Sequence, residues 1–156
     1  MKNIAFLFLF IFIALAQDSN PVFSENALKD KPGSITQSQQ DKYEKDIAPY
    51  IQKALSTYPQ AKKRFLNGLP EGESFFITTR IYDPDGKFEQ IFLYVEKIDT
   101  INITGQIFSQ INPVKNYYFR QRITISEDKI LDWLITKPDG KEEGNFIGKF
   151  LDTYQP

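Results

Sequence analysis

The pattern of apolar and polar positions changes its period partway along the chain, and this change predicts the fold class. In the earlier part, apolar side chains recur three and four positions apart, the spacing of one helical face. This stripe consists of Tyr43, Ile47, Ile51, Ala54 and Tyr58. From Ser74 onward, apolar positions alternate with a period of two, as in a β-strand. The pattern predicts an α+β domain: N-terminal helices packed on a mainly antiparallel β-sheet, with a short C-terminal helix.

Two prolines interrupt the helical stripe. Pro49 and Pro59 lack the N–H group that a helix interior uses, and their rings crowd the preceding turn. We therefore predict a stable helix from about Ile47 to Thr57, preceded by a looser turn. A second, short helix is predicted to begin at Pro59 and to end at Gly68, because glycine is a common helix stop.

The alternating part predicts several strands separated by turns. The predicted strands are 74–82, 88–98, 101–108, 117–125 and 130–136, and the first three are expected to form an antiparallel meander. The tetrapeptide Pro-Asp-Gly-Lys occurs at 84–87 and again at 138–141. It predicts two tight turns, because Pro presets φ, Asp bonds nearby backbone and Gly adopts positive φ. Residues 144–154 are predicted to form a short helix on the sheet.

The first sixteen residues have the three-part layout of a secretory signal peptide. A short basic start is followed by the apolar run 4–13 and by Ala14-Leu15-Ala16, which predicts cleavage after Ala16. We therefore expect a secreted or periplasmic protein, with no stable membrane span after cleavage. An uncleaved N-terminal anchor is the alternative. Residues 17–36 are predicted to be a flexible lead-in, and residues 37–156 the folded domain.

The residue types that are missing narrow the chemistry more than those present. The chain of 156 residues contains no His and no Cys. It therefore lacks Ser-His-Asp and Cys-His catalysis, disulfides, the usual zinc sites and the cysteine that a lipoprotein requires. The net charge of −1 disfavours nucleic acid as a partner. Asp83, Asp85 and Glu89 have oxygen ligands, but they lie at a predicted hairpin turn, so we expect no metal and no cofactor.

Asp132 and Trp133 form the most informative dipeptide, because a carboxylate here lies among branched apolar residues. Adjacent side chains of a strand point to opposite faces, so Trp133 is expected in the core with Asp132 facing the other way. A buried carboxylate needs partners. The favoured interpretation is that Asp132 anchors a neighbouring turn or pairs with Arg80, Arg120 or Arg122. The alternative is that Asp132 faces a ligand.

The segment from Phe75 to Leu151 resembles a bacterial family, the domain of unknown function 2314. The residues that carry this resemblance are Phe76, Ile77, Phe92, Leu93, Gly105, Pro113, Ile130, Asp132, Trp133, Asp139, Gly140, Gly144, Phe146 and Leu151. Departures from the family pattern occur at Leu131, at Arg120-Gln121 and at Asn145. The resemblance implies a secreted or envelope α+β domain and brings no established activity. Its signature residues Asp132, Trp133, Gly144 and Phe146, together with Arg80, are the candidate ligand-facing residues.

These observations favour an exported, non-enzymatic module that binds a protein partner in the envelope or the extracellular space. No catalytic residue is assigned under this hypothesis. The first alternative is a carboxylate-based hydrolase or metal-dependent enzyme that uses Asp132 with Glu142 or Glu143. Two carboxylates with raised pKa values in one pocket would favour that alternative. The second alternative is an immunity or inhibitor protein.

Overall fold

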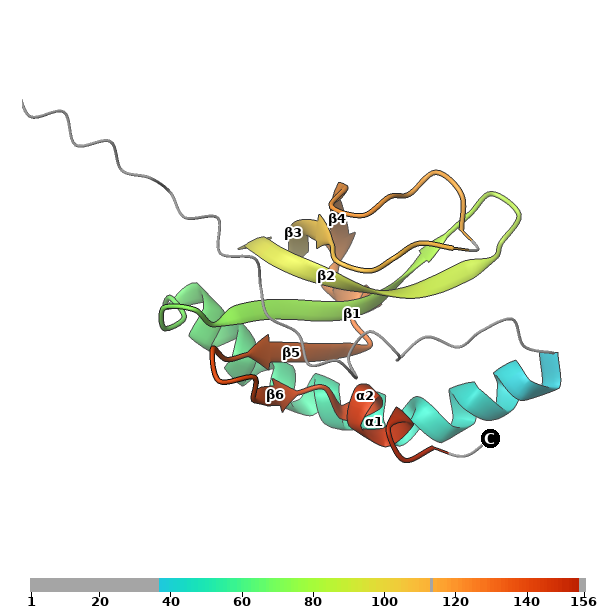
Figure 1. Ribbon diagram of the computed structural model, residues 1–156, viewed down its shortest axis with the longest axis horizontal. Helices are drawn as coiled ribbons and strands as arrows, with labels where there is room; N and C mark the ends of the chain where they lie inside the picture. The colour runs from blue at the N-terminus through green and yellow to red at the C-terminus, as the bar shows by residue number, and fades with distance from the viewer. Residues whose placement is uncertain (1–36, 113, 155–156) are drawn as a thin grey trace, which may run out of the picture.

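The structure, a computed structural model, describes residues 37–112 and 114–154, so the predicted signal peptide and lead-in lie outside the described residues. In chain order the elements are α1 (Gln37–Leu66), β1 (Ser74–Tyr82), β2 (Phe88–Asp99), β3 (Asn102–Ile107), β4 (Arg122–Ser126), the 3-10 turn η2 (Glu127–Lys129), β5 (Asp132–Thr136), β6 (Glu142–Gly144) and α2 (Phe146–Leu151). The strands form one sheet in the order β4-β3-β2-β1-β5-β6, and every neighbouring pair is antiparallel. The predicted α+β fold is confirmed, with both helices at the β5–β6 side of the molecule (Figure 1).

The prediction of two helices is wrong, because α1 runs without a break through both prolines. Pro49 and Pro59 are both exposed, and so are Lys45 and Leu55, the residues four positions earlier whose carbonyl groups lose a helical partner. The buried stripe continues past both of them, from Tyr43 to Ala61. Burial of this stripe against the sheet and α2 therefore outweighs a local cost of about 3 kcal/mol for each proline. Gly68, with φ of 89°, follows the end of the helix as expected.

The meander of the first three strands is confirmed, and the two Pro-Asp-Gly-Lys sequences make the same turn. At the β1–β2 turn, Asp83 N donates to Lys87 O at 2.9 Å, and Gly86 N donates to Asp83 O at 3.0 Å. At the β5–β6 turn, the equivalent bonds join Lys137 to Lys141 and Gly140 to Lys137, both at 2.9 Å. The glycines have φ of 80° and 78°, which is why the turn requires this residue type.

The second half of the sheet differs from the prediction in its boundaries. The expected strand 117–125 is confined to β4, because the chain at Tyr118–Gln121 forms a turn in which Gln121 N donates to Tyr118 O. The strand expected at 130–136 begins only at Asp132. The strand β6 was not predicted, since three residues are too few to show a period. The predicted C-terminal helix is confirmed over the shorter span of α2.

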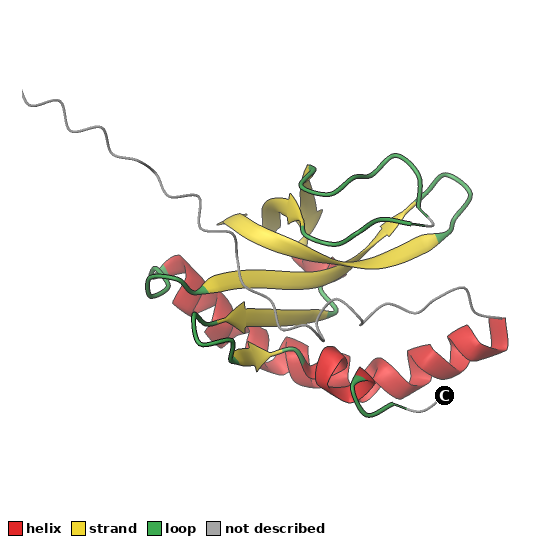
Figure 2. Ribbon diagram, in the orientation of Figure 1, coloured by secondary structure: helices red, strands yellow, loops and turns green. Residues whose placement is uncertain are grey.

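The main core lies between α1 and the face of the sheet that carries the odd-numbered residues of β1. Its buried members include Ala54, Tyr58, Phe75, Ile77, Leu93, Trp133 and Ile135. The opposite face holds a smaller aromatic and aliphatic cluster of Phe76, Phe92 and Leu134, with Tyr94 and Phe108 packed against it. Between β3 and β4, a connection without regular structure runs beside the β1–β2 turn (Figure 2), and Asn112 N donates to the Glu89 carboxylate there. None of the described helices is long and apolar enough to cross a membrane.

Candidate functional site

The junction between β6 and α2 is organised around the Asp132 carboxyl group. The strand β6 ends at Gly144, and the chain then turns into α2 while Trp133 O still accepts a hydrogen bond from Asn145 N. Past this point β5 keeps β1 on one side but has no strand on its β6 side, so the Trp133 N–H and the first N–H groups of α2 need other acceptors. Asp132 Oδ1 accepts from Trp133 N and Oδ2 accepts from Ile147 N, each at 2.7 Å. One side chain thus replaces the missing strand and caps the helix.

The Asp132 side chain takes the capping role because the residue before α2 does not. Asn145 occupies the N-cap position with φ of 51°, and its side chain makes no capping bond. Its amide Nδ2 donates instead to Glu142 Oε2 at 2.9 Å. The prediction that Asp132 anchors a neighbouring turn therefore agrees with its contacts. Its alternative, pairing with an arginine, is not observed: both carboxyl oxygens accept from backbone N–H groups, while Arg80 pairs with Glu44 and Arg122 with Glu96.

Trp133 connects this junction to α1. Its indole Nε1–H donates to Ala54 O at 3.1 Å and to Thr57 Oγ1 at 3.0 Å. Its ring meets Phe146 edge-on with centroids 6.0 Å apart, and it lies 6.5 Å from the ring of Phe75. Trp133 is 7% exposed, so it is the core residue that the sequence predicted.

Gly144 is required at the junction by both conformation and space. Its φ is 76°, in the left-handed region that residues with a Cβ atom rarely adopt. A Cβ atom there would lie 2.2 Å from Trp133 O and 2.7 Å from Cε3 of the indole ring. Glycine therefore allows β6 to end against Trp133 and lets Phe146 pack on the indole edge.

The electrostatics of the junction are unusual because Asp132 is fully buried. Burial raises the pKa of Asp132 to about 7, and the bonds from the backbone of Ile147, Trp133 and Phe146 only partly oppose this effect. A carboxyl group that titrates near neutral pH has a suitable pKa for acid–base catalysis. Asp132 has 0% of its surface exposed, however, so a substrate has no direct access to it.

The structure brings four of the five candidate residues together, namely Asp132, Trp133, Gly144 and Phe146, and it places Arg80 elsewhere. Arg80 lies near the end of β1, where its Nη2 donates to Glu44 Oε1 of α1 at 2.6 Å. Its guanidinium carbon lies 4.6 Å from the centroid of the Phe88 ring, in cation–π geometry. The four junction residues thus form a structural unit, and Arg80 belongs to a different surface.

We call the group formed by Glu44, Arg80, Tyr82 and Phe88 the Arg80 surface. Tyr82 and Phe88 are paired across the β1–β2 hairpin with ring centroids 5.9 Å apart, and Tyr82 is 54% exposed. The Nε atom of Arg80 is buried and finds no hydrogen-bond acceptor in the described part of the chain. Tyr82 was not among the candidates, although its position two residues after Arg80 on one strand face could have revealed it.

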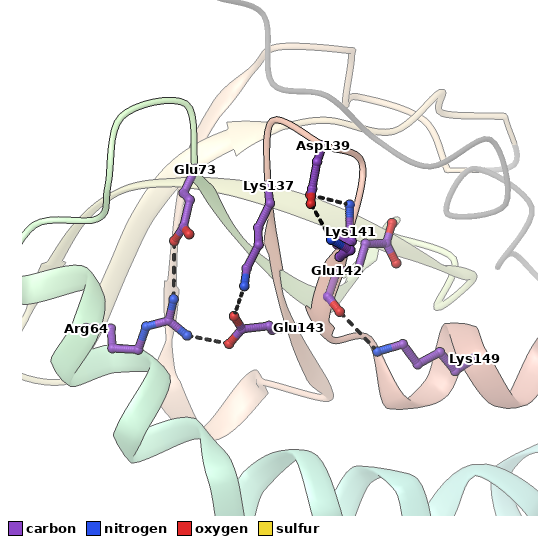
Figure 3. Close-up of polar contacts among 8 residues, drawn as sticks. All are labelled: Arg64, Glu73, Lys137, Asp139, Lys141, Glu142, Glu143 and Lys149. Atoms are coloured by element: carbon purple, nitrogen blue, oxygen red, sulfur yellow. Dashed lines mark hydrogen bonds and ion pairs between the residues drawn. The ribbon is translucent and has the colours of Figure 1, made fainter.

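The other acidic candidates, Glu142 and Glu143, belong to a network of polar contacts beside the junction (Figure 3). The Glu143 carboxylate pairs with Lys137 and with Arg64, which also binds Glu73 at 3.2 Å. The hydrogen bond from Lys137 is the largest influence that lowers the pKa of Glu143. Glu142 contributes its main-chain oxygen to Lys149 Nζ at 3.4 Å. These contacts join the C-terminal end of α1 to the β5–β6 hairpin.

Within residues 37–112 and 114–154, no group of three His, Cys, Asp or Glu side chains is arranged to hold a metal ion. The acids near the β1–β2 turn serve the turn itself, since Asp83 Oδ1 accepts from Lys87 N at 2.9 Å. Comparison of the chain with protein-family models, with curated proteins and with solved structures found no match.

Proposed function

We propose that this chain is an exported, non-enzymatic binding module, and that it recognises a protein partner of the envelope or extracellular space through the Arg80 surface. The observation that carries this proposal is the state of Arg80. A buried N–H without an acceptor costs about 1–3 kcal/mol, so such a group calls for an explanation, which is an ordered water, an ion or a functional role. The exposed ring of Tyr82 lies on the same face, and both residue types are enriched at the centres of protein interfaces.

The contacts of Arg80 also support a recognition role. The ion pair with Glu44 and the packing on Phe88 hold the guanidinium in one orientation. A partner would therefore meet an ordered group and lose less conformational entropy on binding. The chemistry of this surface suits a carboxylate or a main-chain carbonyl of the partner, with an apolar side chain placed over Tyr82.

Export and family membership belong to the same proposal. The apolar run 4–13 and Ala14-Leu15-Ala16 support a cleaved signal peptide. The resemblance to the domain of unknown function 2314 supports a secreted or envelope location. An immunity or inhibitor protein would be one form of such a module. The test of export is N-terminal sequencing of the secreted or periplasmic protein, which is expected to begin at Gln17.

The hydrolase alternative has one observation in its favour, the raised pKa of Asp132. It also needs a second carboxylate with a raised pKa, and the pKa of Glu143 is lowered instead. Burial of Asp132 and the ion pairs of Glu143 argue for structural roles. The binding module is therefore the better-supported function.

The binding proposal is tested by affinity capture from envelope and secreted fractions of the source organism. The baits are wild type, Arg80→Ala, Tyr82→Ser and the control Leu55→Ser, which changes a 44% exposed apolar residue of α1. A partner near one-to-one stoichiometry is expected with wild type and the control, and it should be lost with the other two baits. Equal recovery by all four baits would exclude the Arg80 surface. Recovery of no partner by wild type would count against the binding module itself.

A further inference from the structure

The side of the sheet that faces away from the main core is buried at its centre. Strand pairing places Phe76 and Thr78 of β1, Gln90 and Phe92 of β2 and Leu134 of β5 side by side there. We call these five residues the Phe76 face, and each of them is at most 6% exposed. Side chains of one sheet face stand beside one another and do not cover each other's outer ends. Another part of the molecule therefore lies over the Phe76 face.

The described helices do not provide this cover. Around Phe76, Phe92 and Leu134, the apolar neighbours in the described residues are Tyr94 of β2 and Phe108, which follows β3. The buried apolar residues of α1 and α2 belong to two other clusters, and one of these is the main core on the opposite side. The cover therefore comes from a part of the chain outside the described residues or from a partner.

The first turns of α1 lie at the margin of the Phe76 face. The Tyr43 hydroxyl donates to Gln90 Oε1 at 3.4 Å. Arg80, the partner of Gln90 in the strand pairing, binds Glu44. Gln37, where α1 begins, is about 9 Å along the helix from Tyr43, at a rise of about 1.5 Å per residue. The chain that precedes Gln37 therefore enters the domain close to the Phe76 face.

The segment before α1 has the apolar residues and the length to cover this face. The other parts of the chain outside the described residues are residue 113 and residues 155–156, which are too short. After the predicted cleavage, residues 17–36 remain, with Val22, Phe23 and Leu28 near their middle. These twenty residues can extend to about 66 Å, at about 3.3 Å per residue. The three strands of the Phe76 face lie about 5 Å apart, so this length crosses them with residues to spare.

We propose that residues 17–36 form a strap across the Phe76 face, with their apolar side chains packed on Phe76 and Phe92. Burial of these side chains offsets the conformational entropy that is lost when the strap is ordered. The strap extends the folded domain beyond its predicted start at residue 37. It also borders the Arg80 surface, because Arg80 and Gln90 are paired on the same side of the sheet. These contacts lie within one chain, so they do not require the binding partner of the proposed function.

The test is amide hydrogen exchange of protein expressed from the complete chain, with the free peptide 17–36 as the reference. Exchange at residues 22–28 is expected to be slower than in the peptide by about tenfold or more, because docked main-chain groups are shielded from water. The double variant Val22→Ser with Phe23→Ser and the single variant Phe92→Ala each remove one side of the contact. Each should return the exchange of residues 22–28 to within about twofold of the peptide.

Tyr94→Ser is a milder change to the same face, since Tyr94 is half-buried and its ring centroid lies 5.4 Å from that of Phe76, and it should also speed the exchange. Ile98→Ala is the control, because it shortens a buried residue of the main core and should leave the exchange of the strap unchanged. Wild-type exchange as fast as in the peptide would overturn the proposal. Slow exchange that persists in both Phe92→Ala and Tyr94→Ser would overturn it as well, as would equal acceleration by Ile98→Ala.

Discussion

The buried carboxyl group of Asp132 makes a strong prediction about how stability depends on pH. Burial raises its pKa from the ordinary value of 3.8 to about 7 in the folded protein. Because the folded pKa lies above the unfolded one, the stability due to Asp132 is fully present below pH 3.8 and is lost as pH rises through 7. The loss amounts to about 4 kcal/mol, at 1.36 kcal/mol for each unit of pKa difference.

The perturbation is Asp132→Asn, which keeps the shape of the side chain and removes its titration. Near pH 4 both side chains are neutral, but the carboxamide nitrogen can only donate, so the variant loses one of the two backbone N–H bonds and should be less stable than wild type by about 1–3 kcal/mol. Toward pH 8, wild type must keep a charge buried, whereas the variant does not. The free energy of unfolding of Asp132→Asn minus that of wild type should therefore rise by about 4 kcal/mol between pH 4 and pH 8.

The assay is urea unfolding at several pH values, followed by the fluorescence of Trp133, the one tryptophan of the chain. Asp139→Asn is the matched control, because the exposed Asp139 carboxylate bonds to Lys141 and its pKa is lowered. Its stability difference should be small and should change with pH in the opposite direction. A pH-independent difference for Asp132→Asn would refute the reasoning. It would mean that the two backbone N–H bonds, rather than burial, decide the ionisation of Asp132.

Three further outcomes are expected. Gly144→Ala should lower the free energy of unfolding by about 3 kcal/mol or more, because its Cβ would meet the Trp133 carbonyl. Gly140 has a similar φ and no atom within 4 Å, so Gly140→Ala should lower it by only about 1–2 kcal/mol; equal losses in urea unfolding would contradict this. Trp133→Phe should lose about 1–3 kcal/mol of stability in thermal unfolding, because the indole Nε1–H donates to Ala54 O and Thr57 Oγ1. Thr57→Val should lose less stability, because the bond to Ala54 O remains. Tyr154→Phe should change stability by less than about 1 kcal/mol, because the Tyr154 hydroxyl bonds to Lys42 and Asp46 at a largely exposed site. A larger loss in thermal unfolding would show that these bonds have a main role in holding the C-terminal segment on α1.

The local pattern was sufficient to predict the part of the fold in which neighbours along the chain are also neighbours in space. The meander β1–β3 follows from alternation between 74 and 107 and from a turn tetrapeptide whose geometry depends on its own four residues. Trp133 was predicted to be a core residue because adjacent side chains of a strand point to opposite faces, which separates the indole from the Asp132 carboxylate.

Of the candidate site, the sequence indicated the residues but not their grouping. Asp132, Trp133, Gly144 and Phe146 meet because β6 stops and α2 begins beside β5, and no local period encodes that event. Arg80 was one of three arginines considered as a partner for Asp132, yet an ion pair with Glu44 of α1 holds it at another surface. Which charges pair depends on the packing of elements that are far apart in the chain.

The sequence by itself determined the α+β class, the helical stripe from Tyr43 to Tyr58 and the turn of the first hairpin, since these depend on periods of 3.6 and 2 and on turn chemistry. Only the tertiary structure decided that α1 continues through Pro49 and Pro59, because the gain comes from burying the opposite side of the helix. It also decided that Asp132 serves backbone N–H groups, since its acceptor role exists only once β6 has ended and α2 has docked. Differences in local helix propensity amount to about 1 kcal/mol per residue, and the free energy gained by burying a whole helix face is larger.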